Sequence, residues 1–202
     1  MVPSTSRTHV VTVIYSVVLA ALVASAGAPT NGSLMHVSAL DTLGRFPSVE
    51  GTSLEGEHFT LPADFKSELN VVLVAFTREQ QNDVDSWTPF LKTLGASHPD
   101  LRAYELPTLG RRYRLMRSFI DGGMRRGIPD AAVRATTITL YIDKSPFRES
   151  LKLPDEDRIY VLLVDKQGSV YWQAAGRFTE SMGSELASLA EQREQLLRRG
   201  GR

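Results

Sequence analysis

The stretch Asn70–Phe76 constrains the fold of this chain more than any other, because after its first residue it is apolar without interruption. A strand with one face in water alternates apolar and polar residues, whereas a continuous apolar run is typical of a strand buried on both faces among parallel neighbours. We therefore expect this strand at the centre of the sheet of an α/β domain.

Helical and extended patterns surround this central strand. Trp87, Phe90 and Leu94 recur at helical spacing, which predicts a helix over 82–94 that packs these side chains in the core. Glycines between short β-prone pieces predict a hairpin over 46–61. The other predicted strands are 101–106, 136–142, 159–164 and 169–173, and the other predicted helices are 111–126, 145–151 and 180–199.

The tight turn in Val164-Asp165-Lys-Gln-Gly168-Ser-Val170 joins two of these strands into an antiparallel hairpin. A hairpin, then strand, helix, strand and helix, then this second hairpin and a final helix resembles the thioredoxin-like fold. The resemblance implies a three-layer α/β fold, with a central mixed sheet flanked by helices and preceded by an N-terminal β-hairpin.

The chain contains no cysteine, although redox-active members of this fold carry a C-x-x-C motif after the central strand. The two cysteine positions fall on Gln81 and Val84, and the cis-proline position of the fold falls on Ile159. A thiolate is the attacking species in disulfide exchange and in peroxide reduction. Thiol redox catalysis by this chain is therefore excluded, and we expect the scaffold to act by binding.

We call these three residues, together with Gln80 and Asp83, the vestigial active-site loop. The capping of backbone amides at a helix start explains polar residues there without any function. A small-molecule pocket near Gln81 and Ile159 remains an alternative, with a non-thiol chemistry that the sequence does not specify.

A narrower resemblance is to the mitochondrial ATP synthase assembly factors (ATP10 type), a thioredoxin-like family that helps insert a membrane subunit of the proton channel. The resemblance covers residues 46–191 and implies a chaperone or assembly factor that acts on a membrane protein or complex. It rests on Gln81, Asp85–Trp87, Pro89–Phe90, Tyr104–Leu106, Phe147–Pro154 and Tyr160–Trp172.

The start of the chain has the order of a secretory signal, which a mitochondrial protein would not have. A polar beginning leads into the uncharged run Val10–Val23 and then into Ala24-Ser25-Ala26. We expect a signal peptide over 1–26, a flexible segment over 27–45 and a thioredoxin-like domain over 46–199. Cleavage would place the domain in the periplasm or at the extracytoplasmic face of the membrane, and a retained single-pass anchor is the alternative.

Arginines crowd the predicted helix 111–126, which also carries Leu115, Met116, Phe119 and Ile120 on its apolar side. A basic amphipathic helix suits an anionic membrane surface or a membrane protein client. The competing interpretation is that the arginines pair with internal carboxylates such as those at 155–157. The candidate partner-binding residues are Arg111, Arg112, Arg114, Arg117, Arg125 and Arg126.

No signature of an enzyme, a metal site or a cofactor site is present. The formal net charge of +0 gives no overall field that would recruit nucleic acid. The four histidines form neither an i, i+4 pair nor a cluster with carboxylates, so we expect no metal. The chain has no nucleophile elbow and no phosphate-binding glycine loop. We therefore expect no cofactor and no catalysis.

Overall fold

The structure is a computed structural model that describes residues 41–200, so the predicted segment 1–26 and most of 27–45 lie outside it. The strands are β1 (Gly44–Arg45), β2 (Val49–Ser53), β3 (His58–Leu61), β4 (Leu69–Ala75), β5 (Leu101–Gly110), β6 (Ile138–Ile142), β7 (Tyr160–Asp165) and β8 (Ser169–Ala175). The helices are η1 (Arg78–Gln80), α1 (Gln81–Ser97), η2 (Arg111–Met116), α2 (Arg117–Gly127), α3 (Ala131–Thr136), α4 (Lys144–Ser150) and α5 (Glu180–Gly200), where η denotes a 3₁₀ helix.

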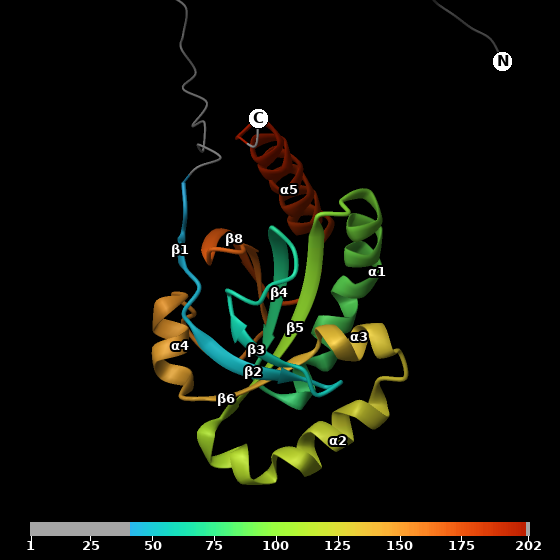
Figure 1. The fold of residues 1–202 in the computed structure, drawn as a ribbon, viewed down its shortest axis with the longest axis vertical. Coiled ribbons are helices and arrows are strands. Elements are labelled where there is room, and N and C mark those ends of the chain that lie inside the picture. Colours follow the sequence, from blue (N-terminus) through green and yellow to red (C-terminus); the bar gives the residue numbers. More distant parts are fainter. Residues whose placement is uncertain (1–40, 201–202) are drawn as a thin grey trace, which may run out of the picture. The chain divides into compact units, whose positions relative to one another are not determined.

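Strand β4 lies in the interior of a mixed eight-stranded sheet with the order β1-β8-β7-β4-β5-β6-β2-β3 (Figure 1). It pairs in parallel with β5 and antiparallel with β7. Every residue of β4 is buried, and successive side chains enter two separate cores, with Val72 and Val74 in one and Val71 and Leu73 in the other. The prediction of a central strand buried on both faces is confirmed.

Helices α1 and α5 close one of the two cores. Trp87 is fully buried there, and its ring meets Phe178 edge-on with the ring centroids 5.3 Å apart. The indole Nε1 donates a hydrogen bond of 3.0 Å to the carbonyl oxygen of Gly176, so the polar edge of the ring is also satisfied. The predicted core role of this helix is confirmed: Leu94 is buried and Phe90 is partly buried.

The β2–β3 hairpin and α4 close the other core. Phe46, just before β2, lies between Phe65 and Phe147, with centroid distances of 5.9 and 5.8 Å. Strands β2 and β3 pair antiparallel with each other, and β2 also pairs antiparallel with β6. The predicted N-terminal hairpin therefore exists, and it extends the sheet at the end away from β8.

Several boundaries differ from the sequence-based expectation. Asp130 caps an unpredicted helix, α3, by accepting a 2.8 Å hydrogen bond from the Ala132 amide, so β6 begins at Ile138 instead of 136. Strand β5 continues to Gly110 because its last three residues pair with β6. Gly44 and Arg45, at the end of the segment expected to be flexible, pair with β8 as β1.

The predicted helix 111–126 requires a larger correction. It is divided into the 3₁₀ helix η2 and the α-helix α2, and its apolar residues Leu115, Met116 and Phe119 are exposed. The two cores are already closed by α1 and α5 on one face and by the hairpin and α4 on the other. Neither core therefore requires this segment as a cover.

We predict that Gly168→Ala destabilises the fold more than Gly56→Ala. Both glycines have positive φ, 89° and 93°, so each substitution carries the same backbone cost of about 1 kcal/mol. A Cβ at 168 would also lie 2.8 Å from Pro62 Cγ, whereas at 56 nothing lies within 4 Å. We expect an additional loss of roughly 1–3 kcal/mol for the 168 variant, measured by urea denaturation. Equal losses would contradict this packing of the β7–β8 turn.

Candidate functional site

Residues 111–127, which make up η2 and α2 and are called the 111–127 segment below, contribute no buried side chain to the fold. The exposed fraction of the side chain is 98% for Leu115, 74% for Phe119 and 52% for Met116. Short helices without a packed face are only marginally stable in water. These features are typical of a segment that is completed by a partner.

The six candidate arginines lie in this segment, and most of them have no internal counter-ion. Arg117 pairs with Asp121 at 3.2 Å and Arg125 with Glu55 at 3.3 Å. Among residues 41–199, the other four form no ion pair, although Arg112 stacks on the ring of Tyr113. The specific expectation of pairing with 155–157 is wrong. Glu156 pairs with Lys144 and Arg148 instead, and Asp155 pairs with Arg158.

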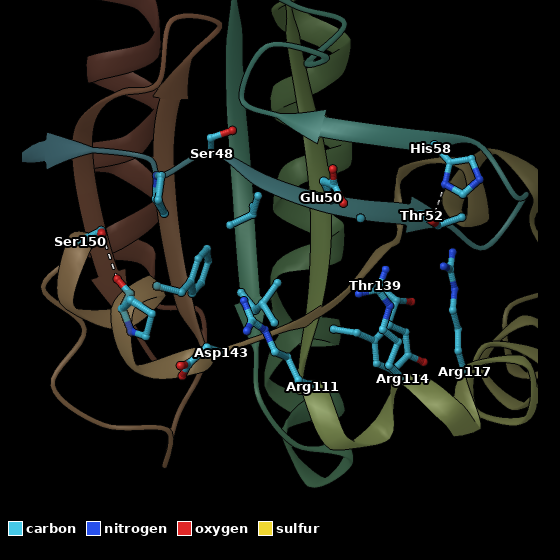
Figure 2. Close-up of a pocket in the computed structure, with 17 residues that line it drawn as sticks. Ser48, Glu50, Thr52, His58, Arg111, Arg114, Arg117, Thr139, Asp143 and Ser150 are labelled. Carbon is cyan, nitrogen blue, oxygen red and sulfur yellow. Dashed lines mark hydrogen bonds between the residues drawn. The ribbon is translucent and has the colours of Figure 1, made fainter.

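A groove of about 780 Å³ lies between this segment and the strands β2 and β6. Figure 2 shows Arg111, Arg114 and Arg117 extending from the segment into the groove, below β2. The opposite wall includes Thr52 and His58, which share a 3.0 Å hydrogen bond between Oγ1 and Nδ1. Sequence reasoning identified the arginines but missed this wall, because its residues come from strands that are distant in sequence.

Gln80, in the vestigial active-site loop, is a structural residue. Its side-chain oxygen accepts hydrogen bonds from the Phe76 and Thr77 amides at 2.8 and 3.4 Å, and its Nε2 donates to the Glu156 carbonyl at 2.7 Å. The side chain is 7% exposed. It fixes the connection between β4 and α1 in the region where relatives carry a redox site.

The remaining residues of that loop differ in burial and in their partners. Gln81 is exposed and donates to Asp85 at 3.0 Å, and Asp83 pairs with Arg177 at 3.4 Å. Val84 and Ile159 are buried in the core under α1 and α5. The groove described above is lined by neither Gln81 nor Ile159, so it is not the pocket that the sequence suggested.

Glu105, which sequence reasoning missed, lies on β5 beside this loop. The pKa of its carboxyl is raised from 4.5 to about 7, mainly by burial and also by the neighbouring Asp85 carboxylate, while a hydrogen bond with Gln81 acts in the opposite direction. The protonated form is therefore favoured in the fold. A carboxylate between the buried residues Tyr104 and Leu106 is the sequence signal that could have identified it.

Two further features bear on function. Within residues 41–200, no group of three or more histidine, aspartate or glutamate side chains is arranged to hold a metal ion. None of the helices in this part of the chain combines the length and the apolar character needed to cross a bilayer.

Solved structures with low sequence identity share this architecture. A putative electron transfer protein from Aquifex aeolicus superposes with a TM-score of 0.52 and 10% identity over 74% of this chain and 94% of that chain. BsSco, described as a member of the Sco family of cytochrome c oxidase assembly proteins, superposes with a TM-score of 0.51 and 14% identity over 75% and 96%. The thioredoxin domain of a Bacteroides vulgatus thiol-disulfide oxidoreductase gives a TM-score of 0.48 with 17% identity over 75% and 99%. The chain has a thioredoxin-like fold.

Residues 41–192 match the family described as "ATP10 protein". Since this match spans most of the chain, the protein belongs to the ATP10 family. No curated protein is similar enough in sequence to count as a match. The fold and family expected from the sequence are thus confirmed, for a chain that carries no cysteine.

We predict that Gln80→Ala lowers the free energy of unfolding by roughly 1–3 kcal/mol, because the buried Phe76 amide and the partly buried Thr77 amide lose their acceptor. Asn82→Ala, at an exposed position near the start of α1, is the matched control. Substitution of this exposed side chain should change the free energy of unfolding by no more than about 0.5 kcal/mol. Chemical denaturation of both variants tests the assignment, and equal effects would show that Gln80 does not hold the β4–α1 connection.

We also predict that Glu105 makes stability fall as pH rises. The unfolded chain releases this proton near pH 4.5 and the folded chain near 7, so between these values the folded state binds more protons. The stabilisation is complete below about 4.5 and is lost as pH rises through 7. Glu105→Gln removes this dependence. The free energy of unfolding of the variant minus that of the parent should therefore increase by roughly 2–3 kcal/mol as pH rises from about 4.5 to about 7.

Asp85→Asn gives an independent test of the same effect. Removing the neighbouring negative charge should shift the Glu105 transition to lower pH. A stability difference between Glu105→Gln and the parent that stays constant from pH 4 to 8, measured by denaturant titration, would contradict the raised pKa.

Proposed function

We propose that this protein is an exported, non-catalytic thioredoxin-like protein that acts as a chaperone or assembly factor for a membrane protein or complex. The observation that carries the proposal is the 111–127 segment, in which exposed apolar side chains stand among arginines and no residue is buried. Such a surface is costly to leave in water and suits a partner that offers both apolar area and negative charge.

Family membership supports a role in assembly, and the absence of cysteine supports binding in place of thiol chemistry. BsSco, with the same fold, is described as belonging to a family of cytochrome c oxidase assembly proteins. We infer that binding is the activity of this chain and that the loop stabilised by Gln80 has no catalytic role.

The place of action follows from the secretory order of residues 1–26, which favours the periplasm or the extracytoplasmic face of the membrane. An exported protein would meet its client from that side of the membrane. We therefore do not transfer the client of the mitochondrial relatives to this chain.

Co-purification from detergent-solubilised membranes tests the function. We predict that Leu115→Ser with Phe119→Ser reduces recovery of the client by roughly tenfold or more, because exposed anchors become central contacts on binding. Leu197→Ser on α5, where the side chain is 40% exposed, is the matched control and should retain the client. Thermal stability should be nearly unchanged in both, since none of the substituted side chains belongs to either core.

Charge is tested separately with Arg112, Arg125 and Arg126 replaced by Gln, since none of these three lines the groove. Client recovery should fall, and more so at low salt, where the attraction between surface charges is least screened. Retention of the client by both the apolar and the charge variants would reject the 111–127 segment as the contact surface.

A further inference from the structure

The groove beside the 111–127 segment has the features of a built binding site. Thr139 on β6, Thr52 on β2 and His58 on β3 are directly paired across three neighbouring strands and all line the groove. Residues paired in this way present their side chains on the same face of a sheet. The result is a row of hydrogen-bonding groups along one wall.

One member of this row is a buried hydroxyl that has no partner. Thr139 is 2% exposed, and its Oγ1 makes no hydrogen bond with any described residue. A buried hydroxyl without a partner is costly, and a native fold retains one only where something else satisfies it. The hydroxyl of the neighbouring Thr52 shares a hydrogen bond of 3.0 Å with His58. Within this row, the missing hydrogen bond is therefore specific to the Thr139 hydroxyl.

The opposite wall supplies positive charge. Arg111 and Arg114 are exposed and form no ion pair with another described residue, and Arg117 joins them at the end of the groove near His58 (Figure 2). Guanidinium groups match phosphate oxygens in geometry and form strong charge-assisted hydrogen bonds with them. Hydroxyl donors facing arginines across a groove suit a phosphate group.

The residues between these arginines indicate the source of that phosphate. Leu115 and Met116 separate Arg114 from Arg117 in the sequence, and they are 98% and 52% exposed. Apolar side chains that project beside a phosphate site suit a molecule whose phosphate is attached to hydrocarbon. Glu50 and Asp143 also line the groove, where their carboxylates can accept hydrogen bonds from headgroup hydroxyls.

We propose that this groove binds the headgroup phosphate of an anionic phospholipid, with Thr139, Arg114 and Arg117 around the phosphate and Leu115 and Phe119 in the apolar layer of the membrane. The inference rests on the proposed function, because it supplies the way in which an assembly factor is held beside its client. The groove volume of about 780 Å³ is ample for a phosphoglycerol headgroup.

Flotation of the full chain with vesicles tests the site. We expect binding to vesicles of phosphatidylglycerol in phosphatidylcholine, little binding to phosphatidylcholine alone, and competition by soluble glycerol 3-phosphate. Arg114→Gln should weaken vesicle binding by about tenfold, as expected for the loss of a charge-assisted hydrogen bond. Arg126→Gln removes the same charge outside the groove and should weaken binding by no more than about twofold.

Thr139→Val separates recognition from general attraction of charges. The hydroxyl has no protein partner, so its removal should leave stability unchanged or higher, while binding of the vesicles and of glycerol 3-phosphate falls by roughly threefold or more. Leu115→Ser with Phe119→Ser should weaken vesicle binding but leave binding of glycerol 3-phosphate unchanged.

Three results would overturn the inference. Equal effects of Arg114→Gln and Arg126→Gln, with no effect of Thr139→Val, would show that vesicle binding depends on surface charge alone. Binding of inorganic phosphate that is unaffected by lipid and by the Leu115 and Phe119 substitutions would identify a free phosphate site. Client recovery without any vesicle binding would remove the lipid site and leave the proposed function intact, since client recovery is measured in detergent.

Discussion

The burial of β4 on both faces is the constraint on which the rest of the structure depends. A strand without a polar face must have a neighbour on each side and a cover above and below, and β4 has β5 and β7 beside it. Its alternating side chains create two cores, and each core requires its own cover. Helices α1 and α5 provide one cover, and the hairpin with α4 provides the other. Elements that take no part in these covers are free for binding.

In the region of the vestigial active-site loop, the fold satisfies its polar groups internally. The side-chain oxygen of Gln80 accepts from two backbone amides, and its nitrogen donates to one backbone carbonyl. Val84 is part of a core, and Ile159 precedes β7 without any exposed surface. Burial, together with the neighbouring Asp85 carboxylate, raises the pKa of Glu105 beside this loop. In this chain, the region where relatives carry thiols therefore has a structural role, which is to hold the connection between β4 and α1.

The sequence was informative where a structure depends on local pattern. The apolar run in β4, the helical spacing of Trp87 and Leu94, and the turn at Gly168 each carry their own signal. Helix α3 was missed because its main signal is a single capping aspartate, Asp130, in a stretch with few apolar residues. The exposure of Leu115 and Phe119 was also missed, because periodicity identifies an apolar side but not whether anything is left for it to cover. The groove wall depends on pairing between β6, β2 and β3, which no local pattern encodes.

The 111–127 segment holds no buried residue, so core packing does not constrain its sequence. Substitutions in most natural helices are limited by the volume and shape of the core beneath them. In this segment a change of residue alters what the surface attracts while the two cores stay as they are. If this segment binds the client, as we propose, substitutions in this one stretch change the partner while the sheet and its covers stay the same. The scaffold and the partner surface are then free to evolve separately.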